Sequence, residues 1–171
     1  MKILKSTLIM VLLLTISQWA VAQSFTVPKD YKLKKKSDYA KYEQDFIGAV
    51  NWLEQVPVGE QTHKRSKVDR FVIEWISGSP DISVVIKENI VVFTDKNPNL
   101  LVNFLGGWGK YALEHPEDKD DEVKCNVAGI RSAIKVYQLG GEIKKDKKME
   151  KLIKLDKNGK LEEWVREQLK K

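Results

Sequence analysis

The chain has 171 residues, of which 30 are Lys or Arg and 24 are Asp or Glu, with one cysteine and two histidines. This length fits one ordinary domain, and 42% hydrophobic with 32% charged residues excludes a disordered chain or a multi-span membrane protein. One cysteine excludes a disulfide framework and a cysteine-rich zinc site, and two histidines leave little for a histidine-built metal centre. We therefore expect no cofactor.

Residues 1–22 have the pattern of a signal peptide. Two lysines precede an apolar run over residues 8–16, and Ala20 and Ala22 form the small-x-small pattern of a cleavage site. The apolar run is too short to cross a bilayer of roughly 30 Å. The sequence therefore predicts an exported protein of the periplasm, cell surface or medium. Its mature chain would begin at Gln23 and have no transmembrane span.

Positive charge gathers at the two ends of the remaining chain. Residues 23–36 form an extended basic arm in which residues 29–36 carry five lysines and one aspartate. Residues 144–171 carry eleven basic and six acidic residues, so residues 37–143 are acidic overall. We expect an anionic surface to meet these ends, and we expect no sequence-specific nucleic-acid binding because lysine dominates without interleaved aromatic side chains. The candidate contacts are Lys34, Lys35, Lys36, Lys144, Lys145, Lys147 and Lys148.

The first predicted helix starts at Ser37 as its N-cap and stops before Pro57, and a second runs over residues 60–76 and is closed by Gly78. Ser79-Pro80 is typical of a further helix start. The β-branched run that follows also suits strands, so residues 81–93 stay open between a helix, an irregular connector and a hairpin.

The second half of the chain shows four more helices. Asn97-Pro98 opens one that Pro116 ends, and residues 120–138 form the most regular helical pattern, which Gly140-Gly141 terminates. Two short amphipathic segments follow, separated by Asn158-Gly159. Six or seven amphipathic helices with short links predict an all-α domain over residues 37–171. A compact bundle is favoured, and a short solenoid of helix pairs is the alternative.

Three blocks, WISGSPDISVVI, NPNLLVNFLGGWGKYALEH and KMEKLIKLDKNGKLEEWV, carry a resemblance. They resemble a group of uncharacterised secreted proteins of Bacteroidota-type bacteria. The resemblance covers most of the mature chain and implies a periplasmic or surface protein. It implies no activity and transfers no functional residue.

A glycine-rich face of the predicted helix that Asn97-Pro98 opens is a candidate ligand groove. Its residues are Val102, Gly106, Trp108, Gly109 and Tyr111. Each glycine costs roughly 1 kcal/mol relative to alanine within a helix, so the cluster needs a reason. One reason is the close approach of a neighbouring helix, and the other is a cleft floored by glycine and walled by aromatic rings.

Three other features have simple structural explanations. The acidic residues 114–122 could bind Ca²⁺, but they fit the start of a helix better. His63 lies in a basic run without a predicted partner, and Cys125 lies beside an apolar stripe, as a buried thiol does. No catalytic motif occurs. We therefore expect a non-enzymatic binding or interaction module, with a small-ligand carrier or an enzyme assembled from distant residues as alternatives.

Overall fold

The computed structural model describes residues 25–171, so the predicted signal segment, residues 1–22, lies outside the described residues. The described part contains seven α-helices, one short 3₁₀ helix and no strand. The elements are α2 (Lys36–Lys41), α3 (Glu43–Leu53), α4 (Thr62–Gly78), α5 (Leu100–Glu114), η2 (Pro116–Asp118), α6 (Glu122–Leu139), α7 (Lys147–Lys157) and α8 (Leu161–Leu169). Over these residues, no helix combines the length and apolarity needed to cross a membrane.

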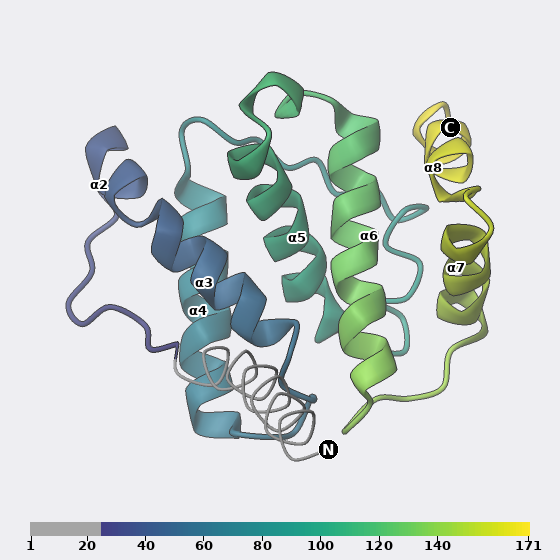
Figure 1. The fold of residues 1–171 in the computed structure, drawn as a ribbon, viewed down its shortest axis with the longest axis horizontal. Helices are drawn as coiled ribbons and strands as arrows, with labels where there is room; N and C mark the ends of the chain where they lie inside the picture. The colour runs from purple at the N-terminus through teal and green to yellow at the C-terminus, as the bar shows by residue number, and fades with distance from the viewer. Residues whose placement is uncertain (1–24) are drawn as a thin grey trace, which may run out of the picture.

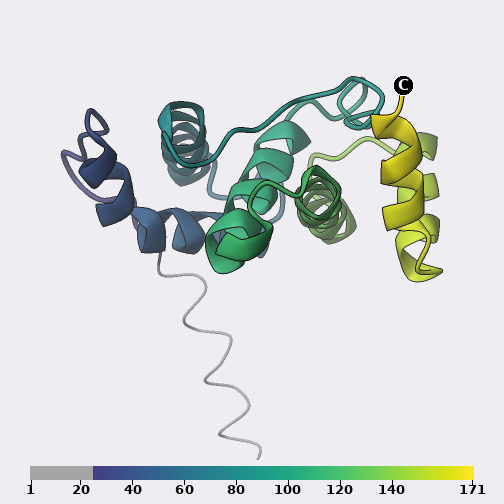
Figure 2. The same cartoon turned by 90° about the horizontal axis from the view of Figure 1, so that it is seen from above.

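Helix α5 occupies the centre of the bundle. It packs against α6 on one side and against α3 and α4 on the other, and α7 and α8 cover the far side of α6 (Figure 1). Seen from above, these layers follow one another from α2 and α4 at one end to α7 and α8 at the other (Figure 2). The prediction of an all-α, compact helical bundle is therefore confirmed.

Several helix ends lie close to the positions that the sequence predicts. The Asp121 carboxylate caps α6 by accepting hydrogen bonds from the backbone N–H groups of Val123 and Lys124, each at 3.0 Å. Gly140 ends this helix with a φ of 81°, a conformation that glycine adopts readily. Asp146 caps α7 in the same way through the N–H of Lys148.

The prediction of the first helix is wrong in two respects. Its N-cap is Lys35 and not Ser37. The Asp38 carboxylate accepts hydrogen bonds from the backbone N–H groups of Lys34 and Lys35, and these bonds allow the helix to begin two residues earlier than predicted. The helix is also broken at Tyr42, whose N–H donates to the carbonyl of Tyr39 in a tight turn. The segment therefore forms two helices, α2 and α3.

Ser79-Pro80 starts no helix. Gly78 is the last helical residue of α4, Ser79 follows as its C-cap, and residues 79–99 form an irregular connector with turns. Figure 2 shows this connector running from the end of α4 along the back of the bundle toward α8. The open choice for residues 81–93 is thereby settled as an irregular connector.

The connector is held by tertiary contacts. Ile90 and Phe93 are buried in the core, and the side chains of Lys87 and Asn89 donate hydrogen bonds to the carbonyls of Leu169 and Gln168 on α8. The connector thus joins the two ends of the bundle. Long-range contacts of this kind have no local sequence signature.

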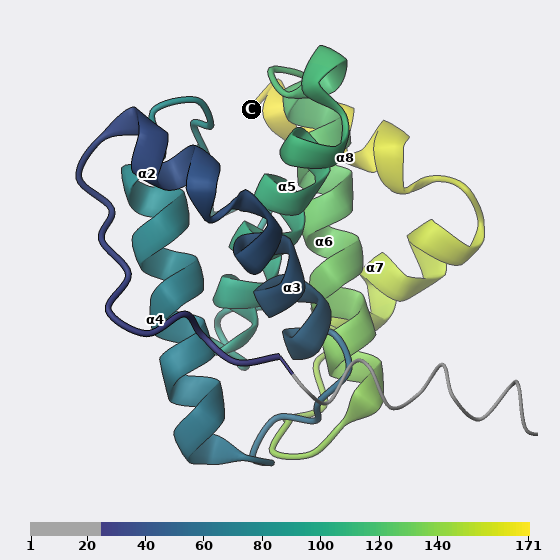
Figure 3. The same ribbon diagram turned by 60° about the vertical axis from the view of Figure 1, so that its left-hand side comes forward.

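The basic arm lies against the helices. In Figure 3 it crosses α4 before it turns up to α2. The ring of Tyr31 meets Phe71 of α4 edge-on, with 4.9 Å between ring centroids, and its hydroxyl donates to Glu74. The arm is therefore docked at its aromatic residues, while Lys34 and Lys35 stay exposed.

Glycine lets the backbones of α5 and α6 approach each other closely. A Cβ on Gly107 of α5 would lie 2.5 Å from the Cβ of Ser132, and one on Gly129 of α6 would lie 2.7 Å from the carbonyl oxygen of Phe104. Contacts that short do not occur between such atoms, so each position requires glycine. The two glycines lie on opposite helices of the same pair.

Gly129→Ala is expected to lower the free energy of unfolding by about 1–3 kcal/mol, because its new methyl group would collide with backbone that cannot move aside. Urea denaturation measures the change. The matched control is Gly48→Ala in α3, where the nearest atom is the movable ring of Phe25 at 3.1 Å. Equal losses in the two variants would contradict a specific contact between α5 and α6.

Candidate binding site

The structure does not gather the five residues of the predicted glycine groove into one cleft. A Cβ on Gly106 would meet Val50, and one on Gly109 would meet Phe46 and Ile76, so both glycines face α3 and α4. Val102 and Trp108 are buried in the core. Tyr111 lines the groove of about 430 Å³ between α5 and α6.

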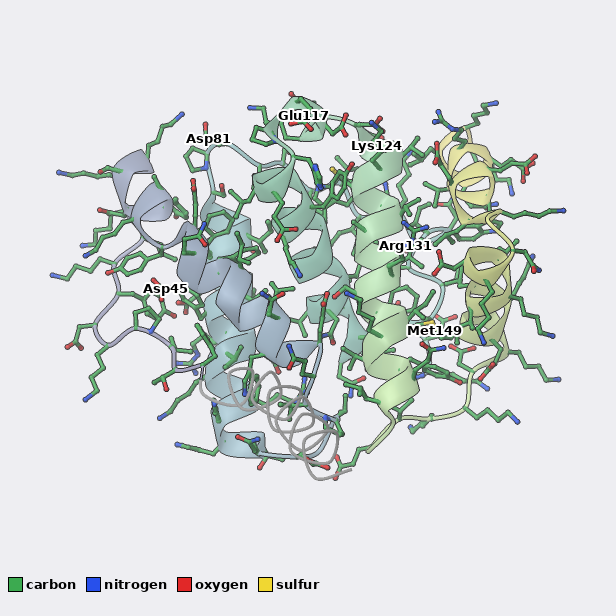
Figure 4. The ribbon with its side chains drawn as sticks, viewed as in Figure 1. Asp45, Asp81, Glu117, Lys124, Arg131 and Met149 are labelled. Carbon is green, nitrogen blue, oxygen red and sulfur yellow. The ribbon has the colours of Figure 1, made fainter. Side chains whose placement is uncertain are left out.

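Four basic side chains line this α5–α6 groove, and each already has an anionic partner. Lys135 pairs with Glu54 at 2.8 Å, and Lys110 approaches the same carboxylate at 3.8 Å. Lys124 and Arg131, which lie along α6 in Figure 4, pair with Asp118 and Asp156. A new ligand would have to compete with these ion pairs, so the groove is a weak candidate.

The remaining sequence candidates stay apart. His63 is exposed on α4, and the acidic stretch is used for capping and for ion pairs such as Asp118 with Lys124. Cys125 is fully buried, and burial raises the pKa of its thiol to about 11. Across residues 25–171, no group of three or more His, Cys, Asp or Glu side chains is arranged to hold a metal ion.

A second cavity, which we call the α4 cleft, runs along the exposed flank of α4 and has a volume of about 600 Å³. Its floor is a helical stripe at spacings of three and four residues, which places these side chains on one face. This stripe consists of Thr62, Arg65, Ser66, Asp69, Arg70, Ile73 and Glu74. Its wall is formed by Val58, Gly59 and Glu142.

The wall joins two distant segments of the chain. Val58 forms an isolated parallel bridge with Gly141, and the N–H of Glu142 donates to the Val58 carbonyl at 2.8 Å. A Cβ on Gly141 would lie 2.1 Å from that carbonyl oxygen, so only glycine fits. This pairing carries the Glu142 side chain over Gly59 and into the cleft.

Arg65 is buried in the floor with 8% of its surface exposed. Its guanidinium donates to the carbonyls of Val56 and Pro57 and lies 5.7 Å from the ring centroid of Trp52. These contacts fix the group in the loop before α4. Its Nε is buried without a hydrogen-bond partner in the described part of the chain.

Asp69 lies one helical turn beyond Arg65. Its Oδ1 atom is buried, and within residues 25–171 the structure shows no hydrogen-bond donor to it. Burial raises the pKa of this carboxyl from 3.8 to about 6, and the positive charge of Arg65 offsets only part of the effect. A carboxyl group with a pKa near neutrality in a cleft is a common mark of a functional position.

Sequence reasoning missed Asp69, although a signal for its burial was present. Arg65, Asp69, Val72 and Ile76 follow at spacings of four, three and four, which puts Asp69 on the flank of the apolar face of α4. A helical-wheel projection would therefore have predicted its partial burial. Glu142 had no such signal, because only the bridge between residues 58 and 141 brings it to the cleft.

No protein-family model, curated protein or solved structure matches this chain. The α5–α6 groove and the α4 cleft differ in how their charged side chains are paired. The four basic side chains of the α5–α6 groove are paired, whereas the Oδ1 atom of Asp69 in the α4 cleft is buried without a hydrogen-bond partner in the described residues.

Asp69→Asn is expected to stabilise the protein above pH 6. A carboxyl group whose pKa is raised by folding destabilises the folded state when it is ionised. Its unfavourable contribution to the free energy of folding is therefore complete above the folded-state pKa of about 6 and absent below the unfolded-state pKa of 3.8. Because the group keeps some contact with solvent, we expect a gain of about 1–2 kcal/mol rather than the full linkage value.

Urea unfolding of Asp69→Asn and of the parent at pH 7.5 and pH 4 measures this gain. Glu88→Gln, which removes an exposed carboxylate from the connector, is the control and should change little at either pH. A gain of the same size at both pH values would contradict a buried, titrating Asp69.

Proposed function

We propose that this protein is an exported, non-enzymatic binding module whose ligand site is the α4 cleft. The observation that carries the proposal is the half-buried Asp69 carboxyl, which lines an open cleft of about 600 Å³ and has its Oδ1 atom buried without a hydrogen-bond partner in the described residues. A partly desolvated carboxylate disfavours folding, and a ligand that bonds to the part of it that faces the cleft would offset that penalty.

Several features favour binding over catalysis. The thiol of Cys125 is buried and stays protonated at neutral pH, because its pKa is raised to about 11. His63 and His115 are exposed and do not line the α4 cleft. The lining of the α4 cleft therefore brings neither a thiol nor an imidazole to Asp69.

Export is proposed from the sequence of residues 1–22 and from the resemblance to secreted proteins. The single cysteine agrees with that location, because a lone thiol in an oxidising compartment is protected when it is buried, as Cys125 is. The mature chain that begins at Gln23 would keep every residue of the α4 cleft.

Small organic probes test the binding function. We expect at least one of glucose, acetate and butylamine to shift the backbone amide signals of residues 58–74 and 142 in ¹⁵N NMR spectra. Ser66→Trp, which fills the cleft, should weaken that binding at least tenfold, whereas Ser83→Trp in the connector should not. Shifts confined to the α5–α6 groove, or no shifts, would contradict the proposal.

A second, independent activity is proposed for the lysines of the two ends. Lys34, Lys35 and Lys36 beside α2, and Lys144, Lys145, Lys147 and Lys148 beside α7, are all exposed. Figure 1 places α2 and α7 at opposite ends of the bundle. We propose that either end adheres to an anionic membrane surface, with at best about 1 kcal/mol for each lysine.

Co-sedimentation with anionic and neutral vesicles tests this adhesion. Binding to the anionic vesicles should fall steeply between low and physiological salt, where the Debye length is roughly 8 Å. Changing the four lysines at positions 144, 145, 147 and 148 to Gln should weaken it. Equal binding by variant and parent, or binding that persists in high salt, would contradict the proposal.

A further inference from the structure

The charges in the α4 cleft compensate the Asp69 carboxyl only in part. Asp69, Glu74 and Glu142 are its carboxyl groups, and Arg65 and Arg70 are its cations. Arg65 is committed to two backbone carbonyls and to the ring of Trp52, and Glu74 accepts a hydrogen bond from Tyr31. The Oδ1 atom of Asp69 accepts no hydrogen bond within residues 25–171, and Asp69 is the most buried of the three carboxyl residues.

Apolar surface lies beside this carboxyl. Ile73 follows Asp69 by one helical turn on the same stripe, and 44% of its surface is exposed. Val58 faces the cleft from the wall. A ligand group at Asp69 would therefore have hydrocarbon contacts available within the same cavity.

We propose that the α4 cleft binds a small primary amine, with its ammonium group on Asp69 and its alkyl stem along Ile73 and Val58. This inference depends on the proposed binding function and specifies its ligand class. An ammonium group supplies a positive charge and N–H donors to the part of the Asp69 carboxylate that lines the cleft. A carboxylate ligand would instead bring a further negative charge next to three carboxyl groups.

Binding of the amine is linked to the protonation of Asp69. With a pKa of about 6, only about a tenth of this carboxyl is ionised at pH 5, and nearly all of it is ionised at pH 7.5. The groups that face it are Arg65 and Arg70 on its own helix, Glu74 beside Tyr31 of the arm, and Glu142 of the wall. A primary amine stays protonated at both pH values, so its affinity should rise with pH.

The first measurement is the affinity of butylamine for the whole protein by NMR titration. We expect the Kd at pH 5 to be about tenfold higher than at pH 7.5. Saturating butylamine should lower the pKa of Asp69, followed through its carboxyl ¹³C signal, because the linkage between proton and ligand is reciprocal. Tighter binding at pH 5, or an Asp69 pKa below 4 in the free protein, would overturn the proposal.

Variants separate the roles of the two ligand parts. Asp69→Asn should weaken butylamine at least tenfold at pH 7.5 and abolish the pH dependence, and Glu88→Gln should do neither. Ile73→Ser should weaken butylamine several-fold and leave methylamine unchanged, because methylamine has no stem to contact Ile73. Since Asp69→Asn is expected to be more stable than the parent at pH 7.5, loss of binding would not reflect unfolding.

Two further probes distinguish the ligand chemistry. Tetramethylammonium has the charge without N–H donors and should bind at least tenfold more weakly than butylamine, and butyrate should not bind. Equal binding of tetramethylammonium would overturn the hydrogen-bonded site. If glucose or butyrate occupies the cleft and butylamine does not, the amine proposal fails while the binding function stands. If no probe enters the cleft, both fail.

Discussion

The fold depends on the direct backbone contact between α5 and α6. Gly107 on one helix and Gly129 on the other leave no room for side chains, so the two backbones meet where most helix pairs are separated by side chains. This contact turns the opposite face of α5 toward α3 and α4, where Gly106 and Gly109 again allow close packing. It also leaves the far face of α6 free to receive α7 and α8, with Met149 reaching from α7 toward α6 (Figure 4).

The packing of α4 against α3 and α5 determines the environment of the cleft. Phe71 and Val72 of α4 are fully buried, so the residues at the edge of that apolar face are held close to the core. Arg65 and Asp69 occupy this edge and lose much of their hydration. Arg65 donates hydrogen bonds to the loop that precedes the helix, whereas the Oδ1 atom of Asp69 accepts none in the described structure. The unfavourable burial of one carboxyl group is therefore a consequence of how α4 packs, and it makes that group receptive to a cation.

Charge has a different role on the rest of the surface. The ion pairs of the α5–α6 groove join α6 to α3 and α7, as Lys135 does with Glu54 and Arg131 does with Asp156. Exposed pairs of this kind contribute little each, typically below 1 kcal/mol, but they leave no uncompensated charge. The lysines at the two ends are exposed, and most of them form no ion pair within the described residues. Their charges therefore face the solvent, unlike those of Arg65 and Asp69 in the cleft.

The all-α class, most helix boundaries and the burial of Cys125 follow from the sequence alone. The reason is that an apolar period of 3.6 residues and helix caps such as Asp121 and Gly140 involve residues that lie close together in the chain. Tertiary structure decided what lies outside that range. It held residues 79–99 as a connector by bonds to α8, and it placed Gly106 and Gly109 of α5 against α3 and α4. It also created the α4 cleft, because the pairing of Val58 with Gly141 and the desolvation of Asp69 arise only when segments far apart in the chain pack together.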